Sequence, residues 1–404
     1  MNIILLFYIT QLLFTSIDGY AYLLSRLFAS RDKLPDSNIL HFPKLSYPDL
    51  TVQDNFDLQW YVVGKSTDFL TNAPYKCRVW NKNYVIWRNE DYELRALDDV
   101  CTHKGASLAG GKIINDQVMC PYHGYEFDCN GTLTKVPGIC FQPSPIYNLA
   151  KYPIVEYDGW IYINTYESPI ADSVSKIQNE ENSTIVSSEM DGPTVIDAAL
   201  YLSNPEHPAN IQNSPEQNCS VVYLDMEYNC YSRVLSENSL DVMHIAFFHT
   251  FGNAKRPSPT KEDPPKLIGK NHYKTTYYYE AGEDSMARKM FGVNDLIIEN
   301  EFILPHTTIA RVKFGEQVST VVTFALPIGD NKSRLFVKTY RNFWQNQVGD
   351  MITRNMMLNT MLQDKIVVEN IDPRFRDGKF NMQFDKLQNT YKSFYKKFID
   401  NGEN

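Results

Sequence analysis

The sequence predicts an α+β protein, in which a small all-β domain precedes a larger domain with an antiparallel sheet and flanking helices. Short apolar runs in residues 57–165 and longer strand-like runs in residues 219–344 predict the two sheets. Two helix-like segments, Asn238–Phe248 and Gly349–Asn370, accompany the longer runs. The chain has 404 residues and is 43% hydrophobic, which is enough apolar material for more than one packed domain.

The N-terminal segment, residues 1–32, opens with an almost unbroken apolar run from Asn2 to Ile17. A membrane span needs roughly 20 apolar residues, so this run is of marginal length. It favours a membrane anchor or an interfacial helix, and Arg26 and Arg31 after it favour a membrane-associated protein with a cytoplasmic body. A cleaved targeting peptide or a packed helix, in a soluble cytoplasmic or organellar protein, stays open as an alternative.

Two polar stretches divide the rest of the chain. The proline-rich residues 33–54 are typical of a linker, and residues 170–194 are rich in Ser, Asn and Glu. We therefore expect the first globular domain over residues 45–168 and the second over residues 190–400.

The overall charge and the cysteines exclude two classes of protein. The formal net charge is −9 and no basic stripe is present, so a nucleic-acid partner is not expected. The seven cysteines are spread over a long chain, which does not resemble a small domain held by disulfides. The cysteine pattern therefore fits a protein of a reducing compartment better than one of an oxidising compartment.

Two thiols and two imidazoles follow one another in the first domain. Cys101 and His103 are separated by one residue, Cys120 and His123 by two, and sixteen residues lie between His103 and Cys120. Two short loops can therefore each present one thiolate and one imidazole to a metal centre. Gly105, Pro121 and Gly124 allow the tight turns that such loops need.

Two metal centres use this ligand set. A tetrahedral zinc ion takes two Cys and two His, whereas a Rieske [2Fe–2S] centre has two Cys on one iron and two His on the other. Zinc sites usually place like ligands together, while this chain pairs each Cys with its own His. The pattern favours the Rieske centre, and a zinc-stabilised binding module remains the alternative.

A second group of polar residues lies in the first predicted helix of the larger domain. Asn238, Asp241 and His244 are three residues apart, which would place them along one helical face. His249 is five residues after His244, a rotation of roughly 140° on a helix, so the helix must end or distort before His249. With that break, two imidazoles could form part of a 2-His-1-carboxylate iron site, although two buried core histidines remain the simpler alternative.

Both patterns resemble those of one family. The pattern C-x-H, sixteen residues, C-x2-H resembles the cluster motif of the Rieske oxygenases, and N-x2-D-x2-H-x4-H is similar to their mononuclear-iron motif. The resemblance implies a Rieske domain followed by a helix-grip-like catalytic domain. It implies that Cys101 and Cys120 hold the inner iron of the cluster, and His103 and His123 the outer iron.

The resemblance also implies the remaining site residues. His244 and His249 would bind a mononuclear Fe(II) together with Asp364, whose setting is similar to that of the family's third ligand, with Glu369 as the competing candidate. Asp241 would not be a ligand, but a catalytic bridge between an iron-bound histidine and a cluster histidine. That bridge usually crosses a subunit boundary, so a homotrimer is the implied assembly.

The implied reaction uses O2 and external electrons to hydroxylate, demethylate or desaturate an organic, lipophilic substrate. No dinucleotide fingerprint G-x-G-x-x-G is present, so a separate NAD(P)H-dependent reductase or ferredoxin is expected as the electron donor. A Rieske electron-transfer protein without oxygenase activity is the rival function.

Overall fold

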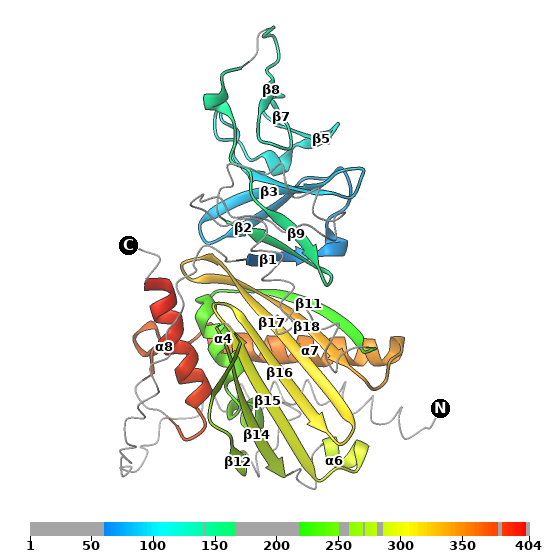
Figure 1. Cartoon of the computed structure of the whole chain (residues 1–404), viewed down its shortest axis with the longest axis vertical. Helices are drawn as coiled ribbons and strands as arrows, with labels where there is room; N and C mark the ends of the chain where they lie inside the picture. Colours follow the sequence, from blue (N-terminus) through cyan, green and yellow to red (C-terminus); the bar gives the residue numbers. More distant parts are fainter. Residues whose placement is uncertain are drawn as a thin grey trace, which may run out of the picture. The chain divides into compact units, whose positions relative to one another are not determined.

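The computed structural model of the chain describes residues 60–140, 143–165, 218–249, 258–269, 271–280, 286–378 and 382–400. Figure 1 shows the path of the chain. The apolar N-terminal run, the predicted linker and the predicted domain boundary lie outside these residues. Within the described part of the chain, no helix combines the length and the apolar character needed to cross a membrane.

The described part of the first domain consists of short antiparallel strands in three sheets. The strand orders are β1-β10-β9, β2-β3-β4 and β5-β6-β7-β8. The strands are β1 (Trp60–Lys65), β2 (Tyr75–Val79), β3 (Lys82–Arg88), β4 (Leu94–Asp98), β5 (Lys112–Ile114), β6 (Gln117–Met119), β7 (Glu126–Phe127), β8 (Leu133–Lys135), β9 (Ile154–Tyr157) and β10 (Trp160–Asn164), with 3₁₀ helices η2 (Ser66–Asp68), η3 (Leu108–Gly110) and η4 (Pro145–Tyr147).

Two-residue turns close two of its hairpins. Asp158 and Gly159 join β9 to β10 with φ angles of 46° and 74°. Asn115 and Asp116 join β5 to β6 with φ angles of 50° and 57°. Asn, Asp and Gly tolerate these left-handed conformations, and turns of this kind match the twist of antiparallel strands.

The second domain contains one large antiparallel sheet. Its strand order is β11-β18-β17-β16-β15-β14-β12, and β13 also pairs with β14. Strands β14 to β18 are a meander in which each strand pairs with the next along the chain (Figure 1). The strands are β11 (Ser220–Tyr228), β12 (Lys261–Glu262), β13 (Lys266–Gly269), β14 (His272–Glu280), β15 (Asp295–Ile303), β16 (Thr307–Phe314), β17 (Gln317–Gly329) and β18 (Lys332–Arg341).

The helices of this domain pack against the sheet and one another. Helix α4 contacts β15 to β18 as well as α7 and α8, and α7 lies along β11. Asn346 caps α7 by accepting a hydrogen bond from the Gly349 N–H at 2.9 Å. The described helices are α4 (Ser232–Leu240), α5 (His244–Phe248), α6 (Met286–Phe291), α7 (Gln347–Val368) and α8 (Lys386–Asp400), with the 3₁₀ helix η6 (Pro373–Phe375).

Alternate residues of the sheet belong to two different cores. Val322 and Phe336 pack with Tyr61 and Trp160 of the first domain. Their neighbours along the strands, among them Val337, pack instead in the core that contains residues of α4 and α7. This alternation is the expected result of a strand whose successive side chains point to opposite faces. One face of the sheet therefore joins the two domains, and the other carries the helices.

The predicted fold class is confirmed, but the predicted helices need correction. The helix expected over Asn238–Phe248 is wrong as a single element, because the chain leaves α4 after Leu240 and begins α5 at His244. Helices α6 and α8 were not predicted. In α8 the buried positions Leu387, Tyr391, Phe394 and Tyr395 have helical spacing, but three of the four are aromatic and stand among polar residues, which weakens the pattern.

Candidate functional site

The two cysteine–histidine loops of the first domain share one backbone hydrogen-bond pattern. In each loop the cysteine N–H donates to the carbonyl five residues later, and the cysteine carbonyl accepts from a glycine N–H four residues later. The two glycines have φ angles of 73° and 72°, which other residues adopt at a cost. The bonds are Cys101 N to Ala106 O (2.8 Å), Gly105 N to Cys101 O (2.8 Å), Cys120 N to Tyr125 O (2.7 Å) and Gly124 N to Cys120 O (3.1 Å).

These loops bury their thiols and expose their imidazoles. Cys101 is 2% exposed and Cys120 is 1% exposed, and both lie in the core of the domain. The rings of His103 and His123 are at the surface, with centroids 4.6 Å apart. Burial raises the pKa of the Cys101 thiol and the adjacent Cys120 raises it further, while backbone N–H groups of the same loop lower it. A centre with an inner sulfur-ligated end and an outer nitrogen-ligated end fits this arrangement.

One compact group of potential metal ligands lies outside these two loops. Among the described residues, His244, His249 and Asp364 are the one group of three or more potential ligands whose donor atoms all lie within 4.8 Å of one another.

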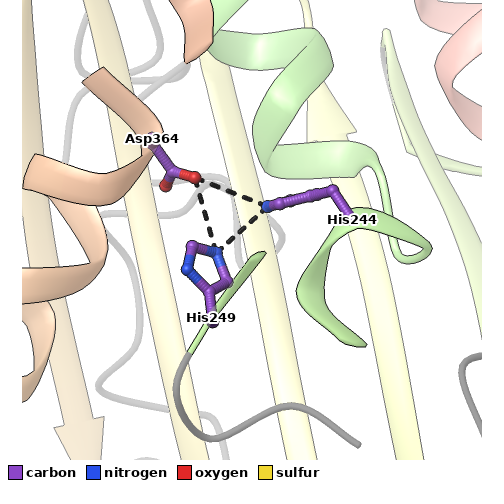
Figure 2. A group of neighbouring side chains, drawn as sticks. All are labelled: His244, His249 and Asp364. Carbon is purple, nitrogen blue, oxygen red and sulfur yellow. Dashed lines mark hydrogen bonds and ion pairs between the residues drawn. The ribbon is translucent and has the colours of Figure 1, made fainter. Parts of the chain in front are cut away.

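Three side chains of the second domain converge on one point. The Nε2 atoms of His244 and His249 are 3.1 Å apart, and the Asp364 Oδ1 atom lies 3.5 and 3.4 Å from them. Figure 2 shows the three groups facing one another, the carboxylate from α7 and the imidazoles from α5 and the residue after it. Bonds near 2.1 Å at right angles place neighbouring ligand atoms about 3 Å apart, so the group fits one face of an octahedral metal ion.

The break between α4 and α5 places the two histidines. Asp241 ends α4 in an extended conformation, and its Oδ1 atom accepts hydrogen bonds from the N–H groups of Met243 (2.7 Å) and His244 (3.4 Å). Helix α5 then ends at Phe248, and His249 is extended, with φ −91° and ψ 143°. The predicted helix end before His249 is therefore confirmed. The predicted common helical face of Asn238, Asp241 and His244 is wrong, because Asp241 separates two helices.

Helix α7 brings Asp364, and not Glu369, to the histidines. The Glu369 Oε1 atom accepts a hydrogen bond from the Asn229 N–H at 2.6 Å and lies 3.6 Å from the Lys365 ammonium. The Asp364 Oδ1 atom is buried and has no hydrogen-bond partner of good geometry within the described residues. An unpartnered buried carboxylate oxygen beside two imidazole nitrogens is the arrangement that a cation would satisfy.

Comparisons with known proteins identify two domains in the chain. The family model described as the Rieske [2Fe-2S] domain matches residues 59–153, and the one described as the vanillate O-demethylase oxygenase C-terminal domain matches residues 228–401. The chain belongs to the Rieske oxygenase family. The cofactors of such a protein are a [2Fe–2S] cluster and a mononuclear non-haem iron.

Several curated relatives are similar over part of their length. The oxygenase component of dicamba O-demethylase from Stenotrophomonas maltophilia is 32% identical over 114 residues, which are 28% of this chain and 33% of the relative. Chlorophyllide a oxygenase from Chlamydomonas reinhardtii is 26% identical over 36% of this chain and 22% of its own length. Cholesterol 7-desaturase from Bombyx mori is 30% identical over 26% of this chain and 23% of its own length. The matched segments thus span a third or less of these relatives.

The fold likeness covers most of the chain. Dicamba monooxygenase bound to 3,6-dichlorosalicylic acid aligns over 86% of this chain and 98% of its own, with a TM-score of 0.68 and 20% identity. NdmA from Pseudomonas putida CBB5, solved with caffeine, aligns over 85% of this chain and 91% of its own, with a TM-score of 0.63 and 16% identity. At these identities the likeness establishes the Rieske oxygenase fold and not a substrate.

The two histidines of the second domain have different electrostatic environments. Burial lowers the pKa of His244, but the carboxylates of Asp364 and Asp241 outweigh it, so the net pKa lies above the ordinary value. Burial lowers the pKa of His249 below its ordinary value, although Asp364 opposes the shift. The neutral imidazole that metal binding requires is therefore favoured at His249.

Two residues at these sites were not predicted from the sequence. Tyr125 stacks on His103, with ring centroids 4.8 Å apart and an interplanar angle of 3°. Gln363 contacts the far side of His249, with 3.1 Å between its Oε1 atom and the imidazole Nδ1 atom. Gln363 precedes the predicted ligand Asp364 in the sequence, and Tyr125 lies beside the predicted ligand His103 in space. A glutamine or a tyrosine does not signal such a role by its residue type alone.

Proposed function

We propose that this chain is a Rieske-type oxygenase, which uses O2 and electrons from a separate reductase to oxidise an organic, lipophilic substrate by hydroxylation, demethylation or desaturation. The observation that carries the proposal is the convergence of His244, His249 and Asp364 in the domain that follows the cluster loops. When bound, the cluster supplies electrons and the mononuclear iron supplies the O2 chemistry.

Cys101 and Cys120 would hold the inner iron of the cluster, and His103 and His123 the outer iron. The buried position of the two thiols and the surface position of the two imidazoles support this division. The exposed imidazole edges are the part of the first domain where electrons could enter and leave over a short distance.

His244, His249 and Asp364 would hold the mononuclear iron on one face, which leaves the opposite positions open. The two imidazoles come from either end of a helix of five residues, and the carboxylate comes from α7. These three side chains would be held in place before the metal binds, and the protein would supply the coordination geometry.

Asp241 would couple the two metal sites. Its Oδ1 atom caps α5, while its Oδ2 atom lies 3.8 Å from the Nδ1 atom of His244. At this distance the carboxylate would act on the imidazole through its negative charge. In a head-to-tail homotrimer the same carboxylate would also face a cluster histidine of the partner subunit, which is the assembly that we propose.

The electron donor would be a ferredoxin or an NAD(P)H-dependent reductase, in line with relatives that are named as oxygenase components. Relatives named for cholesterol and for 3-ketosteroids support a lipophilic substrate, whereas those named for dicamba and vanillate support a small aromatic one. We favour the lipophilic class, because the apolar run Asn2–Ile17 suits membrane association with a cytoplasmic catalytic body.

O2 consumption by the chemically reduced protein tests the proposal before any substrate is known. We expect consumption that depends on the mononuclear site and therefore falls in H249A, and that increases with the substrate in a panel of sterols and aromatic ethers. Equal O2 consumption in the wild type and in H249A, with the cluster intact in both, would indicate an electron carrier instead.

A further inference from the structure

We propose that Gln363 is a positioning residue, which holds His249 in the tautomer and ring orientation that metal binding needs. The inference rests on the proposed metal site. The Gln363 Oε1 atom lies 3.1 Å from His249 Nδ1, while the Asp364 Oδ1 atom lies 3.4 Å from His249 Nε2. Two consecutive residues of α7 thus contact the two nitrogens of one imidazole, and Figure 2 shows the edge that faces Asp364.

The chemistry of the imidazole allows only one arrangement of this contact. A neutral histidine that gives its Nε2 lone pair to a metal carries its proton on Nδ1, so Nδ1 must donate. A glutamine side chain offers an oxygen that accepts and an amino group that donates. With the oxygen of Gln363 toward His249, the Nδ1–H tautomer is favoured and Nε2 remains available to a metal.

His244 has no equivalent contact. Its Nδ1 atom is buried without a hydrogen-bond partner within the described residues, and the Asp241 Oδ2 atom is 3.8 Å away, beyond hydrogen-bond distance. The other oxygen of Asp241 is used in capping α5. Within the described residues, Gln363 therefore makes the Nδ1 hydrogen bond that orients an imidazole of this group.

The turn of α7 that carries Gln363 is itself fixed to the sheet. The Tyr228 hydroxyl donates to the Met361 carbonyl at 3.1 Å, and the Lys365 ammonium donates to the Glu227 carbonyl at 2.6 Å. Met361 is 2% exposed and packs in the core between sheet and helices. Because β11 anchors both sides of Gln363, a buried ring that contacts it is held against a rigid element.

Co(II) binding to the full-length protein, with the mononuclear site emptied by chelation and the cluster intact, tests the inference. In Q363M the side chain keeps its size but loses the acceptor, and we expect the affinity for Co(II) to fall about 10- to 100-fold. Q363E keeps an acceptor and should bind at least as tightly as the wild type. Q347M makes the same change at the exposed first residue of α7 and should leave binding unchanged.

The outcomes separate this inference from the metal site itself. Equal Co(II) affinity in Q363M and the wild type overturns the inference, and so does a loss in Q363E as large as that in Q363M, because packing would then explain the effect. A wild-type protein that takes up no Co(II) overturns the metal site and the inference with it. The Rieske EPR signal reports that the cluster of each variant is intact, and denaturant unfolding reports that its second domain is folded.

The tautomer can also be read without any change at Gln363. In the metal-free wild type, ¹⁵N NMR of labelled histidine, with the His249 signals assigned by their loss in H249A, should show the proton on Nδ1. A proton on Nε2 overturns the inference, because the glutamine would then be the donor.

Discussion

Lys338 of β18 donates hydrogen bonds to the main-chain carbonyl and to the carboxylate of Asp158, in the turn between β9 and β10. The ammonium is completely buried, lies 3.0 Å from the Asp158 Oδ2 atom and is 4.1 Å from the centre of the Trp160 ring. The Tyr340 hydroxyl donates to the same carboxylate at 2.7 Å. An ion pair between a buried lysine and a partly buried aspartate therefore fastens the first domain to the sheet of the second.

Removal of the Asp158 charge is expected to destabilise the protein. D158N keeps a residue that tolerates the turn conformation but leaves Lys338 buried without its counter-charge, which should lower the free energy of unfolding by about 2 to 4 kcal/mol. The exposed pair between Asp225 and Arg334 on the same sheet provides the control, since D225N should cost less than about 1 kcal/mol. Equal losses in the two variants, measured by denaturant unfolding, would contradict the buried pair.

The buried lysine also predicts a pH dependence. Burial lowers the pKa of Lys338 from 10.5 to about 8, although Asp158 opposes the shift. Between these values the unfolded chain binds more protons than the folded protein. The free-energy cost of burying the charged lysine is fully present below pH 8 and is relieved as the pH rises. From this group the free energy of unfolding should increase between pH 8 and pH 10, by at most about 1.4 kcal/mol per pH unit.

The comparison of wild type and K338M isolates that contribution. Above pH 10 the raised pKa of the nearby Tyr223 and Tyr340 acts in the opposite direction, because their unfolded forms ionise first. Between pH 8 and pH 10 the stability of the wild type should therefore rise relative to that of K338M. Parallel stability profiles would show that Lys338 does not titrate in this range.

The proposed role of Asp364 as a metal ligand can be tested by two substitutions in one segment. D364N should abolish binding of the mononuclear iron, leave the cluster signal intact and reduce product formation more than about 100-fold, because the amide is a poor ligand for Fe(II). E369Q, five residues later, should retain the iron, since Glu369 contacts the Asn229 N–H instead. Iron analysis that finds the loss in E369Q and not in D364N would reverse the assignment.

Stacking of Tyr125 on His103 predicts a spectroscopic effect. Y125F keeps the stacked ring, whereas Y125L removes a contact worth about 0.5 to 1.5 kcal/mol and lets the imidazole tilt. We expect the EPR g values of the reduced cluster to shift in Y125L and to stay unchanged in Y125F. Unchanged g values in both variants would show that the stacking does not restrain His103.

The sequence was most informative where the chemistry is local. Cys101 and His123 lie within one short stretch, and their rarity and spacing sufficed to predict two ligand loops. The break before His249 also followed from helical geometry, because a five-residue step cannot aim two side chains at one ion. The additional break at Asp241 was missed, since its cause is a side-chain cap that leaves no periodic signal.

Other features depend on tertiary contacts between distant residues. Asp364 was expected only by resemblance, because the fold brings it to His249 from another part of the chain. Gln363 and Lys338 were not anticipated, since an amide on a helix and a lysine in a strand are usually exposed. Lys338 is buried because Asp158, 180 residues earlier, lies against it.

The most direct test of the central claim is the metal content of the anaerobically purified protein. Iron and acid-labile sulfide should be present at about three and two per chain, and the dithionite-reduced protein should give the rhombic EPR signal of a Rieske cluster. Two irons per chain would contradict a mononuclear site at His244, His249 and Asp364, and zinc without sulfide would contradict both metal centres.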